Sequence, residues 1–301
     1  MGKRLIVLLG PTGVGKTELS IEIARHFHTS IISCDSRQIY REMRIGTAVP
    51  SREQLSAVPH FFIHTLSVKD YYNSWQFEQQ ALDKIRELHH TAEVVLLIGG
   101  SMMYIDALCK GIDDIPTIDP ELREQLMNRM EVEGVEAIRD LLKKLDPVFY
   151  AQVDLNNAKR VLHAVEVCMM AGKPYSSLRT NQPKKREFDI LKIGLNREKT
   201  ELYDRIDKRV DIMLEEGLEG EARSLYPLRH LNPLNTVGYK EFFEYFDNKI
   251  DYEEAVRLIK RNSRRYAKKQ LSWFRRDTAI HWFHPDDKEN IFRWIEGKGE
   301  N

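Results

Sequence analysis

Short apolar runs separated by helical patterns dominate the first hundred residues. Residues 4–9, 31–34 and 94–98 are mostly apolar and are followed by glycine or polar residues, which is typical of buried strands. Residues 189–195 alternate well enough to predict a fourth strand. From Lys16 the pattern becomes helical, with Leu19, Ile23 and Phe27 at spacings of four. Apolar strands that alternate with helices predict an α/β fold, a parallel sheet with helices on both faces.

A long helical stretch interrupts this alternation between the third and fourth strands. Asp119 and Pro120 have the pattern of an N-cap followed by the first helical residue. Helical patterns then cover residues 120–132, 134–145 and 157–171, and Gly172 suits the end of the last helix. We therefore predict an α-helical insertion domain over 117–184, carried by a P-loop core made of 1–116 and 185–301.

Composition narrows the class of protein. The chain has 301 residues, of which 42% are hydrophobic and 31% are charged, so it can bury a sizeable core. Its apolar runs are shorter than the roughly 20 residues that span a membrane, and the N-terminus leaves no room for a signal peptide before residue 10. We expect no membrane partner and a cytoplasmic location. Cys34, Cys109 and Cys168 lie too far apart to indicate a zinc site or a disulfide framework.

A phosphate-binding loop follows the first strand. The motif G-x-x-x-x-G-K-[ST] is matched in full by Gly10, Pro11, Thr12, Gly13, Val14, Gly15, Lys16 and Thr17, between a predicted strand and a predicted helix. The glycines let backbone N–H groups turn towards an anion, and the helix N-terminus adds the positive end of its dipole. Lys16 supplies a charge to the phosphates, and the Thr17 hydroxyl can hold Mg²⁺. The motif predicts a di- or triphosphate ligand.

The Asp that supports Mg²⁺ in P-loop NTPases is missing from its usual position. Such proteins have an apolar strand that ends in Asp, whereas the strand at 94–98 ends in Gly-Gly-Ser. The strand at 31–34 does end in a carboxylate, Asp35, and the carboxyl ends of parallel strands line one crevice. Asp35 should therefore face the loop, as a general base or a neighbour of Mg²⁺, although an Asp in this position can also be a plain turn residue.

A strongly basic helix is predicted near the C-terminus. Lys+Arg and Asp+Glu both total 46, yet residues 257–276 contain nine Lys or Arg and no acid. Ile259, Tyr266 and Trp273 recur at spacings of seven and predict an apolar seam opposite the charges. Such a helix can be a solvated face, a membrane-surface helix or a phosphate-binding element. The charge asymmetry favours contact with a polynucleotide backbone, through a polar face that carries Arg264, Arg265, Lys268 and Lys269.

Several further segments match one family in order along nearly the whole chain. They are Ser-Cys-Asp-Ser-Arg-Gln-Ile-Tyr at 33–40, Ile-Gly-Thr-Ala-Val-Pro at 45–50, Pro59-His60, Gly99-Gly100-Ser101 with Tyr104, Asp146-Pro147, Arg205-Ile-Asp-Lys-Arg209 and Val237-Gly-Tyr-Lys240. With the P-loop, they resemble the bacterial tRNA dimethylallyltransferases. The P-loop alone is shared by many families, whereas the segments at 33–40 and 237–240 together are far more specific.

The resemblance implies a reaction and a donor site. The five-carbon group of dimethylallyl diphosphate moves to N6 of the adenosine 3′ of the anticodon in tRNA, and diphosphate leaves. The P-loop then holds the donor diphosphate rather than ATP, with Mg²⁺ on Thr17. Asp35 matches the general base of the family, and Lys16 and Arg209 match residues that stabilise the diphosphate. Arg205, one turn before Arg209, is expected to serve packing or ion pairs.

The resemblance also implies contacts to the tRNA anticodon stem-loop. The expected residues are Asp35, Ser36, Arg37, Gln38, Ser101, Arg123, Lys159, Arg160, His163, Lys240 and the four basic residues of the C-terminal helix. Ser101 stands where the family usually has Thr, and His163 stands where it usually has Arg. A histidine in an apolar helix is often a core residue, so Arg160 carries more weight. We expect a monomer.

Three other functions remain open at this point. A prenyl transferase that acts on free AMP would use the same donor site, but it would not require the basic helix. A P-loop kinase for a small metabolite would use the loop and Asp35, but it would require neither the basic helix nor Val237-Gly-Tyr-Lys240. A non-enzymatic RNA-binding module would leave the loop and Asp35 without a role.

Overall fold

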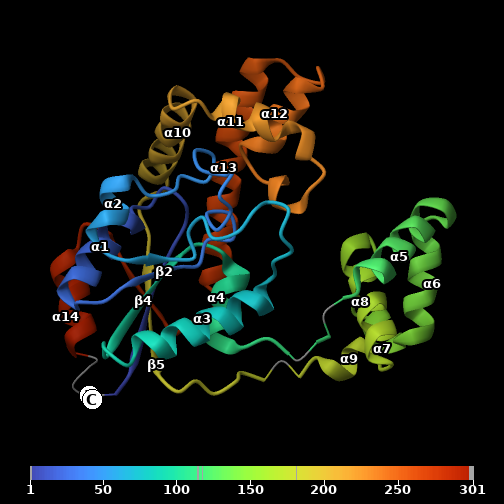
Figure 1. The fold of residues 1–301 in the computed structure, drawn as a ribbon, viewed down its shortest axis with the longest axis horizontal. Helices are drawn as coiled ribbons and strands as arrows, with labels where there is room; N and C mark the ends of the chain where they lie inside the picture. The colour runs from blue at the N-terminus through green and yellow to red at the C-terminus, as the bar shows by residue number, and fades with distance from the viewer. Residues whose placement is uncertain (1, 114, 117, 181, 298–301) are drawn as a thin grey trace. The chain divides into compact units, whose positions relative to one another are not determined.

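The computed structural model describes residues 2–113, 115–116, 118–180 and 182–297. The chain divides into two compact units, Met1–Cys109 with Arg186–Asn301, and Lys110–Lys185 (Figure 1). The sequence predicted an insertion over 117–184, and residue 117 lies outside the described residues. Within the described ranges, no helix is both long and apolar enough to cross a membrane.

The first unit is built on a six-stranded sheet in the order β3-β2-β4-β1-β5-β6. The strands are β1 Arg4–Leu9, β2 Ile31–Ser33, β3 His60–Phe61, β4 Val94–Gly99, β5 Asp189–Leu195 and β6 Ile280–Phe283. All neighbouring strands pair in parallel, so the predicted parallel sheet is confirmed. The edge strands β3 and β6 were not predicted, because runs of two and four residues that include a histidine lack a strand pattern.

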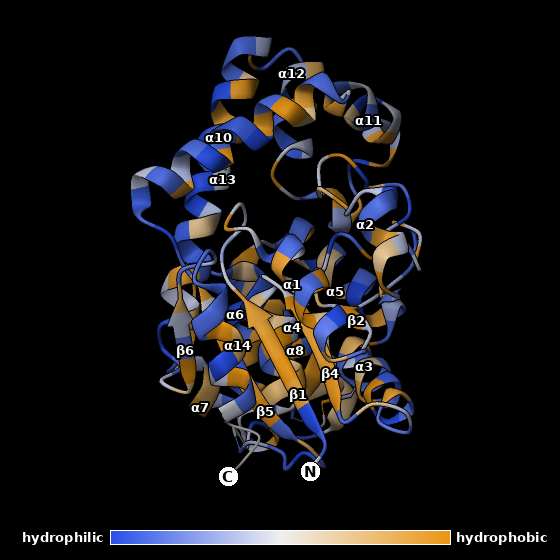
Figure 2. Cartoon of the chain, turned by 90° about the vertical axis from the view of Figure 1, so that its left-hand side faces the viewer, coloured by the Kyte–Doolittle hydropathy of each residue, from blue (hydrophilic) through white to orange (hydrophobic). Residues whose placement is uncertain are grey.

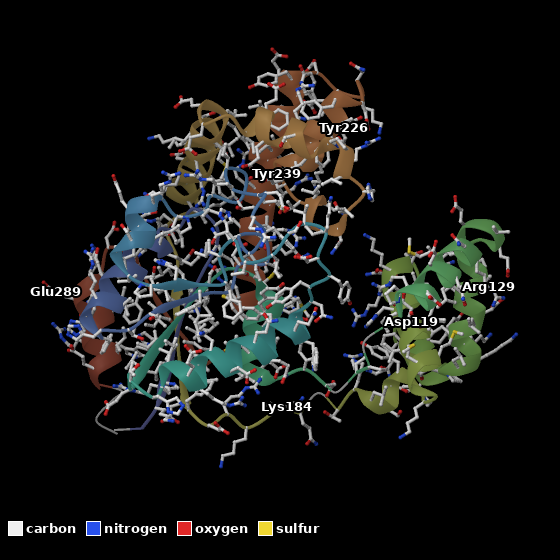
Figure 3. All side chains as sticks on the ribbon, in the orientation of Figure 1. Asp119, Arg129, Lys184, Tyr226, Tyr239 and Glu289 are labelled. Carbon is white, nitrogen blue, oxygen red and sulfur yellow. The ribbon has the colours of Figure 1, made fainter. Side chains whose placement is uncertain are left out.

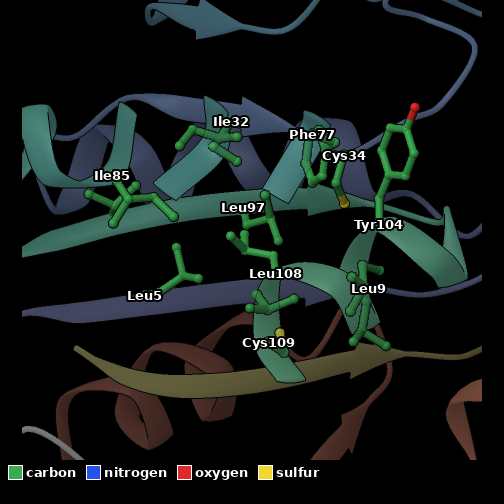
Figure 4. Close-up of a cluster of buried hydrophobic side chains, with 14 of the residues drawn as sticks. Leu5, Leu9, Ile32, Cys34, Phe77, Ile85, Leu97, Tyr104, Leu108 and Cys109 are labelled. Atoms are coloured by element: carbon green, nitrogen blue, oxygen red, sulfur yellow. The ribbon is translucent and has the colours of Figure 1, made fainter. Parts of the chain in front are cut away.

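Helices cover both faces of this sheet, as predicted. The α-helices of the first unit are α1 Lys16–His26, α2 Arg52–Ala57, α3 Ser74–Leu88, α4 Met102–Lys110, α10 Lys199–Glu215, α11 Leu218–Leu225, α12 Tyr239–Phe246, α13 Tyr252–Phe274 and α14 Lys288–Gly297. Leu5, Val7 and Leu9 of β1 pack against α3 and α4 (Figure 4). Ile6 and Leu8 face the other way and pack against α1, α10 and α14. Because both faces of β1 are covered, the strand is apolar from Leu5 to Leu9, after Arg4 (Figure 2).

A separate apolar cluster lies beyond the sheet, formed by α11, α12 and parts of α10 and α13. Tyr239 and Phe242 of α12 are fully buried in it, together with Ile259 of α13. Figure 3 labels Tyr239 within this group of helices. The chain segment Ile39–Met43, which follows β2, also packs into this cluster. The cluster thereby links the C-terminal helices to the segment that follows Asp35.

The second unit consists of short helices around its own core. They are α5 Pro120–Glu133, α6 Val135–Leu145, α7 Pro147–Tyr150, α8 Ala158–Ala171 and α9 Tyr175–Leu178. Asp119 caps α5 by accepting a hydrogen bond from Glu121 N, and Gly172 ends α8 with φ of 61°. The core of this unit includes Leu126, Ile138, Phe149 and Val165.

Candidate active site

The carboxyl ends of three strands bring the predicted chemical residues together. The P-loop follows β1, Asp35 follows β2 and Ser101 follows β4. The sheet order places β4 between β1 and β2, and Cys34 N donates a hydrogen bond to Ile98 O of β4. The segments at 10–17, 35–38 and 99–101 therefore meet at one edge of the sheet.

The glycines of the P-loop are required by its backbone. Gly10, Gly13 and Gly15 have φ of 153°, 80° and 106°, a region that residues with a Cβ rarely adopt. A Cβ on Gly10 would lie 2.7 Å from Leu195 O, so any larger residue would also clash with β5. Backbone N–H groups of the loop can then turn to one side, as an anion site needs.

Lys16 is held inside the loop close to other charges. Its Nζ donates to Gly10 O at 3.0 Å and to Pro11 O at 2.8 Å. Burial and the nearby Arg209 guanidinium lower the pKa of Lys16 to about 8, while Asp35 acts in the opposite direction. Burial also lowers the pKa of Arg209. Neither cation has an ion-pair partner within 4 Å among the described residues. Two cations that repel each other beside loop N–H groups indicate a site for an anion.

Three side chains from the C-terminal half hold the loop backbone from outside. Gln270 Oε1 accepts a hydrogen bond from Thr12 N at 2.9 Å. Arg205 Nε donates to Gly13 O at 2.9 Å, and Arg197 Nε donates to Val14 O at 2.9 Å. Gln270 and Arg197 were not among the predicted residues, and Arg205 was expected to serve packing or ion pairs. The partners are up to 258 positions apart in the chain, so no local pattern could have indicated them.

The Asp35 carboxylate is oriented by the turn that follows it. Its Oδ1 accepts hydrogen bonds from Arg37 N at 2.8 Å and Gln38 N at 3.2 Å. Its Oδ2 accepts no hydrogen bond from the described residues. Asp35 also contributes to the charge environment of Lys16 and Arg209. One oxygen is thus anchored, while the other is left for a ligand beside the phosphate loop.

The neighbours of Asp35 are engaged in positioning this turn. Ser101 is only 7% exposed; its Oγ accepts from Ser36 N at 2.8 Å and donates to Ser36 Oγ at 3.2 Å. The Gln38 amide donates to Thr47 O at 3.1 Å and Ala48 O at 3.0 Å. The side chains of Ser101 and Gln38 therefore bind the protein itself in this structure, and Arg37 Nη1 donates to Ser36 O.

A partly buried carboxylate joins two of the motif segments. Glu221 accepts hydrogen bonds from the backbone N–H groups of Arg44, Ile45 and Gly46 at 2.8–3.0 Å. Tyr239 Oη donates to Glu221 Oε1 at 2.6 Å. A Cβ on Gly46 would lie within 2.8 Å of the Tyr239 ring, which explains glycine at this position. The motifs at 45–50 and 237–240 thus form one structural connection, and Gln38 continues it to Asp35.

Helix α13 carries the predicted basic face, but neighbouring acids neutralise part of it. Arg264 Nη1 lies 2.5 and 2.6 Å from the two carboxylate oxygens of Asp207, and Lys260 Nζ lies 2.5 Å from Asp211. Both acids are on α10. Arg265, Lys268 and Lys269 are exposed and have no acidic partner within 4 Å among the described residues.

The predicted apolar seam of this helix is wrong in part. Ile259 is buried, but Tyr266 is 38% exposed and Trp273 is only partly buried. The buried positions of α13 are Ala255, Leu258, Ile259, Ala267, Gln270 and Phe274. Desolvation and the nearby Asp35 carboxylate raise the pKa of Tyr266 to about 12. Tyr266 therefore lies outside the core and close to the candidate site. A single seam with a period of seven fails here because a helix that packs on several elements has more than one buried stripe.

The remaining predicted contact residues are on α12 and on the helices of the second unit. Lys240 is the second residue of α12, and its Nζ lies 3.8 Å from Glu241 Oε1. Lys159 and Arg160 are exposed at the start of α8 in the second unit. Arg123 forms a bidentate ion pair with the buried Glu166 at 2.7 and 2.8 Å. His163 lies 3.6 Å from the same carboxylate.

The fold and the loop define a P-loop protein with an anion site at the carboxyl edge of a parallel sheet. The family model for IPP transferase matches residues 38–277. Similar proteins include tRNA dimethylallyltransferase 1 of Bacteroides fragilis, 56% identical over 98% of each chain. Another is tRNA dimethylallyltransferase 2 of Parabacteroides distasonis, 58% identical over 96% of each chain.

Solved structures agree with this match. The tRNA isopentenylpyrophosphate transferase of Bacillus halodurans is 35% identical with a TM-score of 0.72, over 99% of this chain and 97% of that one. A eukaryotic dimethylallyltransferase acting on tRNA has a TM-score of 0.78 and 28% identity, over 91% of this chain and 70% of that one. The chain belongs to the IPP transferase family, which confirms the resemblance drawn from the motifs.

Proposed function

We propose that the protein transfers the dimethylallyl group of dimethylallyl diphosphate to N6 of the adenosine 3′ of the anticodon in tRNA and releases diphosphate. Membership of the IPP transferase family and the similarity to tRNA dimethylallyltransferases over nearly the whole chain support this reaction. It is a transferase reaction in which the carbon–oxygen bond to diphosphate breaks and a carbon–nitrogen bond to adenosine forms.

The gathering of cations around the P-loop carries the donor assignment. Burial and the nearby Arg209 guanidinium lower the pKa of Lys16, and burial lowers the pKa of Arg209. An entering diphosphate supplies the missing negative charge, and its charge grows as the carbon–oxygen bond breaks. Cations and N–H groups already in place stabilise that growth without reorganising. The loop residues Gly10, Pro11, Thr12, Gly13, Val14, Gly15, Lys16 and Thr17 form the diphosphate site.

Asp35 is proposed as the general base. The adenine amine is a weak nucleophile and must lose a proton when it gains the prenyl carbon. Because Oδ1 is anchored by Arg37 N and Gln38 N, Oδ2 is presented at a defined position to receive that proton. The adenosine must leave its base stack to reach this oxygen. Ser36 and Arg37 border the same position.

Mg²⁺ is proposed as a cofactor held mainly by the donor. Among the described residues no group of three or more His, Cys, Asp or Glu side chains could hold a metal ion. Mg²⁺ commonly binds substrate phosphates with few protein ligands and several waters, so a hydroxyl at the loop suits it. Thr17 is the residue that would hold it, and the ion would help to neutralise the diphosphate.

The contacts to the tRNA anticodon stem-loop are proposed for exposed basic residues. Arg265, Lys268 and Lys269 on α13 carry charge that no acid of the described chain neutralises. Lys159 and Arg160 offer a second exposed group on the helical unit, which we propose is an inserted domain. We further propose that the protein is a monomer and that it acts on tRNA in the cytoplasm.

A transfer assay with separate acceptors tests the proposal. Radiolabelled dimethylallyl diphosphate is incubated with the protein and with tRNA, AMP or ATP in turn, and Lys16→Ala serves as the control. We expect label in tRNA only, and a loss of at least about 100-fold in the Lys16→Ala variant. Labelling of AMP alone would favour the free-nucleotide prenyl transferase, and rapid ATP turnover without donor would favour a kinase.

A further inference from the structure

Helix α13 contains one buried polar side chain among its basic residues. Gln270 is only 2% exposed, whereas its neighbour Lys269 is fully on the surface. Both ends of the Gln270 amide are used. Its Oε1 accepts from Thr12 N at 2.9 Å, and its Nε2 donates to Gly100 O at 2.8 Å. Gln270 thus bridges the phosphate loop after β1 and the glycine segment after β4.

Glycine at position 100 leaves the space that the Gln270 amide occupies. A Cβ on Gly100 would lie 2.3 Å from Gln270 Nε2 and 3.2 Å from Gly10 O, so only glycine lets the amide approach. Gly10 O in turn accepts a hydrogen bond from Lys16 Nζ. The amide, the glycine segment and the catalytic lysine are therefore in successive contact. A buried amide whose donor and acceptor are both used has a single preferred orientation.

The bridge has a consequence for the anion site. Thr12 N–H, of the peptide between residues 11 and 12, is committed to Gln270, and Gly13 O, of the peptide between residues 13 and 14, is held by Arg205. Two peptide groups fixed from outside, with only one between them, limit the directions that the peptide N–H groups at residues 13–17 can take. Donors that point at the anion before it binds stabilise it without the cost of ordering the loop.

We propose that Gln270 is a positioning residue for the donor. It holds the phosphate loop in its anion-binding conformation. Gln270 is itself positioned by α13, the helix that we propose binds tRNA. The residue lies next to Lys269 and two positions after Lys268, so one helix positions the groups that meet both substrates. The inference rests on the proposed function, because it takes the loop as the diphosphate site.

The test uses inorganic pyrophosphate as the probe and two variants of α13. Gln270→Met keeps the side-chain length but removes both hydrogen bonds. Trp273→Phe is the matched control, because it removes one hydrogen bond of the same helix, from Trp273 Nε1 to Asp106 Oδ2 at 2.8 Å, away from the loop. We expect Gln270→Met to weaken pyrophosphate binding by about tenfold, as for the loss of one net hydrogen bond. Trp273→Phe should bind as the wild type does.

Hydrogen exchange gives a readout that a general loss of stability would not produce. In the absence of ligand, the peptide that covers residues 8–17 should exchange faster in Gln270→Met but not in Trp273→Phe. Should Gln270→Met fail to fold, Gln270→Leu also removes both hydrogen bonds and adds no charge. We expect Gln270→Leu to weaken pyrophosphate binding by about tenfold as well and to speed exchange in the same peptide.

The outcomes separate this inference from the proposed function. Wild-type affinity for pyrophosphate in a folded Gln270 variant would overturn the positioning role while leaving the donor site intact. A weakening of equal size in Trp273→Phe would also overturn it, because the effect would then belong to helix packing. Wild-type protein that binds no pyrophosphate would instead refute the diphosphate site.

Discussion

Replacing three basic residues of α13 separates the charges that are available to tRNA from those already paired within the protein. The triple variant Arg265→Gln, Lys268→Gln and Lys269→Gln removes exposed cations that have no acidic partner among the described residues. Arg264→Gln is the matched control on the same helix, because its guanidinium is already bound to both oxygens of Asp207.

The size of the expected effect follows from counterion release. Each phosphate contact contributes about −0.7 to −0.9 to the slope of log K against log salt, so three lost contacts make the slope shallower by about 2 to 3. Over a fourfold rise in salt, the wild type should then lose about 20- to 40-fold more tRNA affinity than the triple variant. Arg264→Gln should leave the slope nearly unchanged, since the Asp207 carboxylate already neutralises that cation.

Filter binding of tRNA at several salt concentrations measures the slope, and pyrophosphate affinity of each variant shows whether the donor site is intact. An unchanged slope in a folded triple variant would mean that the exposed face of α13 meets only solvent. A change in Arg264→Gln as large as one third of the triple effect would refute the argument that Asp207 withdraws this charge from the nucleic acid.

Three further perturbations test the site and the second unit. Asp35→Asn keeps the shape of the turn but removes the base. In a prenyl-transfer assay kcat should therefore fall by about 10²- to 10⁴-fold, with little change in tRNA affinity. A change in the KM for tRNA alone would make Asp35 a residue that only positions substrate. Because the pKa of Lys16 is about 8 in the unliganded protein, the ammonium is lost as pH rises through 8, and an anion binds the charged form better. The pyrophosphate affinity of the wild type relative to Lys16→Met, measured by calorimetry, should therefore decline above about pH 8, by up to about tenfold per pH unit, whereas a constant ratio would contradict the charge assignment. Arg123→Ala leaves His163 as the one basic partner of the buried Glu166 among the described residues. Denaturation should show a loss of about 1–3 kcal/mol, less than for a fully buried pair because Arg123 is 38% exposed, while exposed Arg160→Ala should leave stability unchanged.

The P-loop and Asp35 could be predicted because the patterns that indicate them are local in the sequence. Gly10 to Thr17 form a contiguous motif whose glycines are required by the backbone of the loop itself. Asp35 follows directly after an apolar strand, and the rule that parallel strands end at one edge brings it near the loop. The helical interruption between two strand patterns likewise needs no knowledge of tertiary contacts.

The charges on α13 show what the sequence could not decide. Residues 257–276 contain no acid, yet Asp207 and Asp211 on α10 neutralise Arg264 and Lys260. Which of the basic residues remain available depends on which helix packs alongside. The predicted apolar seam is wrong in part for the same reason. The positions of a helix that become buried depend on the elements packed against it and not on its own period alone.

The sequence by itself determined the parallel α/β core, the phosphate loop, the carboxylate beside it and the family, since each is carried by short contiguous patterns. The tertiary structure alone decided the edge strands β3 and β6, the connection through Glu221 and Tyr239, and the bridge made by Gln270. These features depend on hydrogen bonds between residues far apart in the chain, such as Thr12 and Gln270. A polar side chain acquires such a role when folding brings unpaired backbone groups next to it. The residues that flank it in the sequence do not indicate which backbone groups those will be.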